Sequence, residues 1–151
     1  MKELRCDNLG KKLKTTPYRS NMMSKIKSKG GKGEILLGKL LWHKGIRYRR
    51  NYKFLPGKPD ITITKSKIAI FVDGEFWHGY DWENQKKIRL HRNRKFWINK
   101  IEGNIHRDRK EEVELRQMGW MVLRFWEKHD VLKSPEKCVD VVLEAIKSRA
   151  K

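Results

Sequence analysis

Four acidic residues of this chain occupy positions where a folded domain is expected to place packing side chains: Glu34, Asp60, Asp73 and Asp108. A carboxylate removed from water is costly unless a cation or hydrogen-bond donors compensate its charge. A set that points inward indicates a hard cation such as Mg²⁺, which proteins hold through one or two carboxylates and several waters. Taken alone, Glu34 or Asp108 is better explained by solvent exposure or by pairing with one of the 37 basic residues. The metal hypothesis therefore rests on Asp60 and Asp73.

A predicted β-hairpin brings Asp60 and Asp73 together. Residues 60–64 alternate between polar and apolar, residues 68–73 are rich in strand formers, and three polar residues separate the two runs. If the hairpin closes with Lys65-Ser66 at its tip, Asp60 lies opposite Phe71, and Asp73 is its diagonal neighbour within about 7–8 Å. Two carboxylates this close repel each other unless a cation or a proton lies between them. The pair therefore predicts a metal site at the end of a core hairpin.

His78 lies just beyond the strand that ends at Asp73, in a turn bounded by Gly74 and Gly79. An imidazole titrates near neutral pH and suits a general base. Its place beside the two predicted metal carboxylates distinguishes it from the other histidines, which we interpret as structural: His43, His91, His106 and His129. We therefore predict general-base chemistry at His78.

Aromatic residues come in consecutive pairs at Phe76-Trp77 and Phe96-Trp97. Neighbours on an extended chain point in opposite directions, so either one packs in the core and one is exposed, or both insert into a ligand. Apolar side chains wedged between base steps are a known way to deform DNA. Both explanations stay open for Phe76, Trp77 and Trp97. Core packing is expected for three other tryptophans: Trp42, Trp120 and Trp126.

The net charge indicates the class of partner. With 37 Lys and Arg against 18 Asp and Glu, the 151 residues carry a formal net charge of +19. This much positive charge opposes compaction unless an anion is the usual partner, and nucleic acid is the commonest such anion. An acidic membrane surface is the main rival, but no convincing basic amphipathic helix supports it. A hydrophobic share of 38% with six Trp excludes a disordered basic tail.

Other features of the composition predict where the protein works. No apolar run reaches the roughly 18–20 residues of a membrane span, and the N-terminus lacks the apolar region of a secretory signal. Cys6 and Cys138 are too few and too far apart for a disulfide framework or a zinc cluster. These observations predict a reducing, cytoplasmic setting.

The elements that position the candidate side chains are predicted to form one α/β domain after a basic arm. Residues 1–33 hold ten Lys and Arg against two acids and form the arm, and residues 34–151 form the domain. Short strands are predicted over 46–50, 60–64, 68–73 and 120–125, and helices over 34–44, over 93–118 and from 134 onward. The last helix is expected to bury Cys138, Val141, Val142, Ala145 and Ile146. We expect a small mixed sheet with helices packed on it.

Five segments together resemble the very-short-patch repair (Vsr) family of DNA mismatch endonucleases. They are residues 18–23 (YRSNMM), 56–60 (PGKPD), 71–79 (FVDGEFWHG), 104–109 (NIHRDR) and 119–127 (GWMVLRFWE). The order and spacing of the last four make the resemblance specific. It implies a restriction-endonuclease-like α/β fold, with a mixed β-sheet flanked by α-helices. It also implies a monomer, associated with the nucleoid, that nicks DNA 5′ to the T of a T:G mismatch, which arises when 5-methylcytosine deaminates.

The resemblance also implies catalytic roles. Two Mg²⁺ ions would activate the water and stabilise the leaving oxygen. Asp60 would bridge the metals, and the main-chain carbonyl of Val72 would be a further ligand. His78 would be the general base, and Glu34 and Asp108 would hold metal-bound waters or orient it.

Contacts with double-stranded DNA follow from the same resemblance. Phe76, Trp77 and Trp97 would intercalate beside the mismatch from the major groove. Met23 would enter from the minor-groove side, and Arg19 and Lys58 would contact the DNA as well.

The chain departs from the family pattern at positions that bind a structural zinc in many members. Those members carry Cys where this chain has Glu75 and Lys128, and further Cys or His where it has Tyr80 and Asp81. We therefore expect no zinc, and we expect Tyr80 and Trp82 to hold the loop instead. A second departure is Asp73, where some members have His, and an extra carboxylate there is a candidate direct metal ligand.

Two other functions stay open. One is a sequence-specific restriction-type endonuclease on the same fold, because one fold hosts several cleavage specificities. The other is a non-catalytic nucleic-acid-binding module. The charge fits both, but inward carboxylates weaken phosphate binding unless a metal intervenes, which argues against the module.

Overall fold

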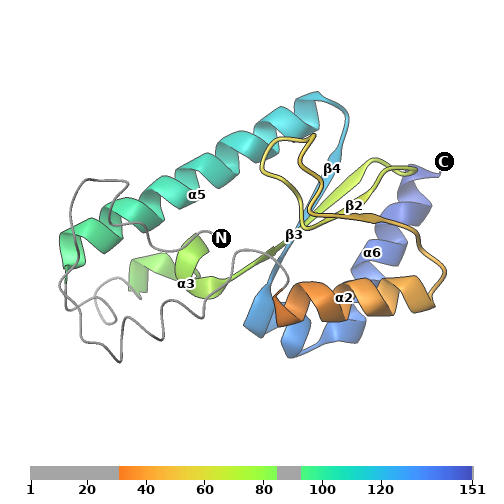
Figure 1. Ribbon diagram of the computed structural model, residues 1–151, viewed down its shortest axis with the longest axis horizontal. Helices are drawn as coiled ribbons and strands as arrows, with labels where there is room; N and C mark the ends of the chain where they lie inside the picture. The colour runs from red at the N-terminus through yellow and green to blue at the C-terminus, as the bar shows by residue number, and fades with distance from the viewer. Residues whose placement is uncertain (1–30, 85–92, 151) are drawn as a thin grey trace.

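The computed structural model describes residues 31–84 and 93–150, and its centre is a four-stranded mixed sheet (Figure 1). The strands are β1 (Arg49–Arg50), β2 (Ile61–Ile63), β3 (Ile68–Asp73) and β4 (Met121–Trp126), in the order β1-β2-β3-β4. β1 pairs with β2 and β2 with β3 in antiparallel fashion, whereas β3 and β4 are parallel. The prediction of an α/β fold with a mixed sheet is confirmed.

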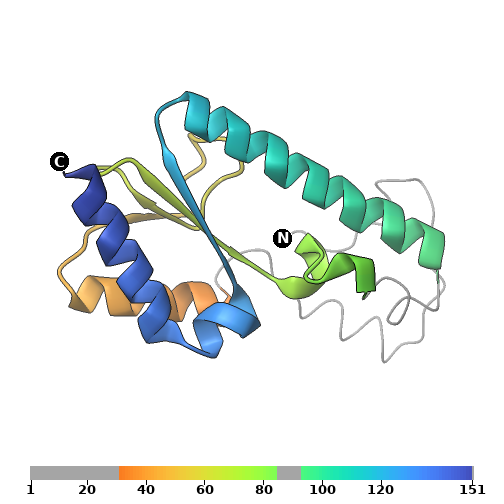
Figure 2. The same cartoon turned by 180° about the vertical axis from the view of Figure 1, so that it is seen from behind.

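Helices cover both faces of this sheet, as the two opposite views show (Figures 1 and 2). They are α2 (Lys32–His43), α3 (Glu75–His78), α5 (Arg94–Gln117), the π-helical turn η2 (Glu127–Leu132) and α6 (Pro135–Arg149). α2, η2 and α6 pack on one face, and the C-terminal part of α5 packs on the other. The N-terminal part of α5 extends beyond the sheet toward α3 (Figure 1). None of the helices described is both long and apolar enough to cross a membrane.

The β2–β3 hairpin has the register that a tip at Lys65-Ser66 gives. Ile61 pairs with Ile70 and Ile63 with Ile68, and the interior of both strands is buried. These isoleucines join the main core with residues of α2, η2 and α6, whereas Ala69 and Phe71 face the opposite side and meet Leu115 of α5. Because the period of a strand is two, the residues that share a face with Phe71 are directed toward α5. Asp73 is one of them.

Several boundaries and packing positions differ from prediction. α2 begins at Lys32, two residues before the predicted start, and the predicted strand 46–50 is reduced to Arg49–Arg50. Ile46 packs against the main core. Residues 75–78, expected to lie in a turn between Gly74 and Gly79, form the short helix α3. Arg19, Met23 and most of the predicted arm lie outside the described residues.

Two predicted core residues are exposed. Trp42 is 49% exposed because Leu37 and Leu41 occupy the inner face of α2, and its ring is covered instead by the guanidinium of Arg47 at 3.7 Å. Val141 is 45% exposed, and Val139 is buried in its place. The other predicted tryptophans, Trp120 and Trp126, are half-buried.

Candidate active site

Asp60 lies at the start of β2, where the main chain leaves a loop that contains two prolines. Its Oδ2 accepts a hydrogen bond of 2.7 Å from the backbone N–H of Val72 on the neighbouring strand. Burial, together with the charges of Glu34 and Asp73, raises the pKa of this carboxyl to about 8, against the lowering effect of the hydrogen bond from the Val72 N–H. A divalent cation beside this carboxyl would favour its ionised form.

Glu34 is placed beside Asp60 by the first turn of α2, and it is only 3% exposed. Arg50 of β1 donates a hydrogen bond of 2.7 Å to its Oε2. The turn itself is fixed by Glu127, whose Oε2 accepts a hydrogen bond of 3.0 Å from the N–H of Gly33. The N-cap residue Gly31 has no side chain that could accept a hydrogen bond from these N–H groups. Glu127, a distant residue of η2, caps the helix instead.

Asp73 ends β3 and is paired with Arg124 of β4. Nη1 of Arg124 donates to both carboxylate oxygens of Asp73, at 3.0 and 2.8 Å. Its Nε donates to Glu112 of α5, and its guanidinium lies over the ring of Phe71 at 4.1 Å. Burial raises the pKa of Asp73 despite the opposing charges of His78 and Arg124. Both oxygens of Asp73 thus contact an arginine, and Asp60 is not the sole charged neighbour of Asp73.

His78 ends α3 and meets Asp108, which lies midway along α5. Its Nδ1 is 2.5 Å from Oδ2 of Asp108 and 3.7 Å from Oδ1 of Asp73. Burial lowers the pKa of His78, but the hydrogen bond to Asp108 and the charge of Asp73 outweigh it, so the pKa lies above its ordinary value. A carboxylate at Nδ1 favours the tautomer with the proton on Nδ1, which leaves Nε2 as the basic nitrogen.

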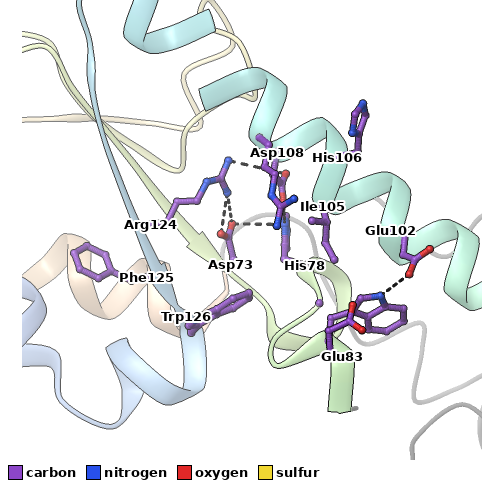
Figure 3. Close-up of a pocket in the computed structure, with 13 residues that line it drawn as sticks. Asp73, His78, Glu83, Glu102, Ile105, His106, Asp108, Arg124, Phe125 and Trp126 are labelled. Carbon is purple, nitrogen blue, oxygen red and sulfur yellow. Dashed lines mark hydrogen bonds and ion pairs between the residues drawn. The ribbon is translucent and has the colours of Figure 1, made fainter. Parts of the chain in front are cut away.

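These side chains line one pocket of about 600 Å³ between α3, α5 and β4 (Figure 3). Asp73 and Arg124 enter it from the sheet, Asp108 from α5 and His78 from α3, and the dashed lines of Figure 3 connect all four. The structure therefore brings His78 together with Asp73 and Asp108, as the prediction requires. Asp60 and Glu34 form a second group beside them, and this group is close enough to Asp73 for its charge to raise the pKa of Asp60.

Phe76, Trp77 and Trp97 form one aromatic cluster. Their ring centroids are 5.2 to 6.3 Å apart with steep interplanar angles, which is the edge-to-face arrangement that aromatic rings prefer. Trp97 is 3% exposed, and Phe76 and Trp77 are half-buried. The expectation that these two neighbours point in opposite directions was wrong, because they lie on a helical turn and both reach Trp97.

The turn that carries His78 is attached to η2 through Glu75. Oε2 of Glu75 accepts hydrogen bonds from the N–H groups of Lys128 and His129, at 2.8 and 2.9 Å, and contacts Nδ1 of His129 at 2.8 Å. Burial raises the pKa of Glu75, but these hydrogen bonds outweigh it and hold the pKa below its ordinary value. Tyr80 stacks on the His129 ring at 3.8 Å, and Trp82 donates to Glu102 at 2.9 Å.

The donors that could hold a divalent metal are the carboxylates of Asp60 and Glu34. No three His, Cys, Asp or Glu side chains within residues 31–84 and 93–150 are arranged to hold an ion by themselves. Mg²⁺ requires only one or two carboxylates beside its waters. The buried carboxyl of Asp60, whose pKa is raised next to two further acids, is chemically suited to such an ion.

The chain matches the family model of the DNA mismatch endonuclease Vsr over residues 12–84. It is 47% identical over 135 residues to the type II nicking enzyme V.NmeDIP of Neisseria meningitidis serogroup C, covering 89% of this chain and 90% of that protein. It is 48% identical over 128 residues to the type II nicking enzyme V.HpaIIP of Haemophilus parainfluenzae, with 85% and 89% covered. The DNA mismatch endonuclease Vsr of Escherichia coli K12 is 34% identical over 125 residues, with 83% and 78% covered.

The chain belongs to the Vsr family. This confirms the resemblance drawn from the five sequence segments, and with it the restriction-endonuclease-like fold. The Vsr-family chain is an endodeoxyribonuclease, and its substrate is DNA.

Four residues that hold this Vsr-family site together were not among the predicted site residues: Arg50, Glu75, Arg124 and Glu127. Arg124 had a detectable signal, since it is a charged residue inside the apolar run 120–126 and a buried arginine requires an acidic partner. The other three act across long sequence separations, such as the 94 residues between Gly33 and Glu127. Lys58, a predicted DNA contact, is exposed in the loop just before Asp60.

Proposed function

We propose that this Vsr-family endonuclease uses Mg²⁺ to nick one DNA strand 5′ to the T of a T:G mismatch. The observation that carries the proposal is the contact of His78 with Asp108 at 2.5 Å in a pocket next to Asp60, whose carboxyl is suited to a divalent cation. A positioned base beside such a carboxylate is what hydrolysis of a phosphodiester requires. We place this activity in the cytoplasm at the nucleoid, and we propose that the enzyme acts as a monomer.

In this proposal Nε2 of His78 takes the proton of the attacking water, since Nδ1 is engaged by Asp108. Asp108 keeps the imidazole oriented and stabilises the imidazolium that forms. Arg124 holds Asp73 in place and adds positive charge next to the pocket. The imidazole of His78 is thus held by Asp73 from the sheet and by Asp108 from α5.

Asp60, with the main-chain carbonyl of Val72, would hold the metal, and Glu34 would orient water beside it. Bound Mg²⁺, as one ion or two, supplies Lewis-acid stabilisation of the developing negative charge. Asp73 is a weaker candidate ligand than the sequence suggests, because both of its oxygens already accept hydrogen bonds from Arg124.

Recognition of the mismatch is assigned to the cluster of Phe76, Trp77 and Trp97. Mispaired bases are easier to unstack than paired ones, so an aromatic wedge selects them. Phe76 and Trp77 share α3 with His78. Insertion of the two rings beside the mismatch would therefore place the imidazole of His78 next to the adjacent phosphate. Met23, Arg19 and Lys58 are proposed to add contacts to the same duplex.

A strand-specific cleavage assay tests the proposal. Two matched duplexes, one with a single T:G pair and one with C:G, are incubated with Mg²⁺ or with EDTA. We expect a nick 5′ to the T only in the mismatched duplex with Mg²⁺. Asp60→Ala should abolish the nick and leave duplex binding largely intact, and nicking at the wild-type rate by this variant contradicts the metal assignment.

The two relatives of 47% and 48% identity carry the name type II nicking enzyme, which favours a second candidate on the same site. In this alternative the enzyme nicks a specific sequence whether or not it contains a mismatch. The C:G duplex distinguishes the two candidates, provided that both duplexes share one sequence context. Nicking of both duplexes at equal rates supports the second candidate and contradicts mismatch specificity.

A further inference from the structure

Glu75 cross-links α3 to η2 at the place where the two central strands separate. β3 and β4 stay paired up to Asp73 and Trp126, and beyond this point one chain enters α3 and the other enters η2. The carboxylate of Glu75, 7% exposed, receives the N–H groups of Lys128 and His129. The sheet ladder is thus followed by a side-chain connection.

The chemistry of this connection is that of a helix cap supplied from outside the helix. The first N–H groups of a helical turn have no acceptor within it. Oε2 of Glu75 accepts two consecutive ones in η2, and Nδ1 of His129 makes a third contact with the same oxygen at 2.8 Å. A carboxylate that accepts several hydrogen bonds at a helix N-terminus is firmly held, because the charge and the dipole attract each other.

Aromatic rings cover this connection on one side. Tyr80 stacks on the His129 imidazole with centroids 3.8 Å apart and an interplanar angle of 14°. Its ring also meets Trp126 edge-on at 5.2 Å. The N–H of Tyr80 donates to the carbonyl of Glu75 at 3.0 Å, so Tyr80 closes the turn that Glu75 begins.

The same turn carries His78 at its other end. On the side of α5, the turn is held by Asp108 through His78 and by Asn104, which donates to the carbonyl of Trp77 at 3.0 Å. On the side of the sheet, it is held by Glu75. Because α3 has only four residues, it cannot keep its own geometry without such tertiary contacts.

A structural zinc, which the resemblance places at this point in many Vsr-family members, does not fit these residues. Structural zinc sites use four Cys or His ligands. Here Glu75 and His129 already contact each other, Lys128 contributes its main chain, and no group of three candidate ligands exists in the described part of the chain. Oε1 of Glu75 is buried without a hydrogen-bond partner among the described residues, so the turn depends on the other oxygen.

We propose that Glu75, His129 and Tyr80 form a metal-free cross-link that positions His78 for catalysis. The inference rests on the proposed role of His78 as the general base. Glu75 is a positioning residue in this scheme, because it acts on His78 through the α3 turn and touches neither the metal-binding carboxylates nor the pocket.

The test compares Glu75→Ala, Glu75→Gln and His129→Ala in the full-length chain. Single-turnover nicking of the T:G duplex gives the chemical rate, and a binding titration gives the duplex affinity. We expect Glu75→Ala to slow nicking about 10²-fold, as small displacements of catalytic groups do, with affinity for the fully paired C:G duplex unchanged within about twofold. Glu75→Gln, which keeps an acceptor for the Lys128 and His129 N–H groups, should recover most of the rate. Glu144→Ala on α6, an exposed carboxylate, is the matched control.

A zinc chelator tests whether the cross-link is free of metal. A strong zinc chelator, followed by excess Mg²⁺, should change neither the melting temperature nor the rate of the wild-type enzyme. A fall in the melting temperature or in the nicking rate that Zn²⁺ restores overturns the metal-free cross-link. Wild-type nicking rates for Glu75→Ala overturn the positioning role.

Hydrogen exchange keeps this inference separable from the proposed function. If the wild-type enzyme does not nick the T:G duplex, the proposed function fails, but the cross-link is still measurable. Glu75→Ala should then speed exchange of the Tyr80 and His129 amides by at least about tenfold, with the global stability measured in parallel. Unchanged exchange at both amides overturns the cross-link itself.

Discussion

The imidazole of His78 and the carboxylate of Asp108 are separated by 30 residues in sequence and by 2.5 Å in space. His78 is at the end of a four-residue helical turn, and Asp108 is in the middle of a helix of 24 residues. The contact therefore depends on how α5 lies across the end of the sheet.

Asp108→Asn removes the charge that orients His78. An amide at this position accepts the Nδ1 proton less strongly and can present its NH₂ group instead, which favours the wrong tautomer. We expect the single-turnover nicking rate to fall by about 10²-fold or more, within the range of general-base effects. The acid limb of the pH–rate profile should move to lower pH, because the carboxylate that raises the pKa of His78 is lost. Asp140→Asn on α6, which is exposed, should change neither. A rate and profile equal to wild type contradict the assigned base.

Asp60 should make the metal-free protein less stable as the pH rises. Its pKa is about 8 in the folded protein and near 3.8 when unfolded, so between these values the folded state binds the extra proton. The free energy of unfolding then decreases with pH across this window. Asp73 and His78, whose pKa values are also raised, act in the same direction.

Asp60→Asn should therefore reduce this slope without abolishing it. The measurement is urea unfolding in EDTA at several pH values from 4 to 9, where these limits are set by the pKa values near 3.8 and 8. At the alkaline end, the variant should be more stable than the wild type. Parallel pH curves for the two proteins contradict the proton assignment.

Glu127 should stabilise the first turn of α2, and with it Glu34. Glu127→Ala removes the acceptor of the Gly33 N–H, and loss of a cap costs about 1 kcal/mol. Glu127→Gln keeps an acceptor and should retain most of the stability. Gly33→Ala should destabilise as well, because its Cβ would lie 2.7 Å from Cγ of Glu127 and 3.3 Å from Cγ1 of Val72.

Urea unfolding measures these changes, and Mg²⁺ titration of nicking reports the effect on Glu34. We expect Glu127→Ala to require a higher Mg²⁺ concentration for half-maximal nicking than Glu127→Gln. Equal stability of the wild type and Glu127→Ala is the result that excludes a capping role.

The segment around β1 should bind the DNA backbone outside the active site. Residues 35–59 contain seven Lys and Arg and no acidic residue, and all seven basic side chains are exposed. This row reaches the active site at Arg50, which contacts Glu34. Arg47→Glu with Arg49→Glu should weaken duplex binding and reduce the slope of log K against log salt by about 0.9 per lost phosphate contact.

The single-turnover rate at saturating enzyme should stay within about twofold of the wild type, because neither Arg47 nor Arg49 lines the catalytic pocket. Lys137→Glu with Lys147→Glu on α6 has the same change of charge and serves as the control. Equal losses of affinity in the two double variants would indicate a general effect of net charge instead of a binding face.

The sequence alone determines the local parts of this site. The alternation in residues 60–64 and the apolar run 68–73 predict the hairpin. The register follows from them only once the tip is placed at Lys65-Ser66, and a shift by one residue would turn every isoleucine to the wrong face. The order of the family segments predicts the class of enzyme, and family membership confirms it. The net charge of +19 predicts an anionic partner.

The partners of each functional side chain are decided by the tertiary structure. Nothing local to Asp73 indicates that Arg124 takes both of its oxygens, and nothing local to Glu34 indicates Arg50 or the cap from Glu127. Trp42 is exposed although its type predicts burial, because two leucines already fill the inner face of its helix. Charges and rings act over a few ångströms, so their roles depend on distances between elements. Periodicity within one element fixes which face a residue occupies, but only packing between elements fixes what that face meets.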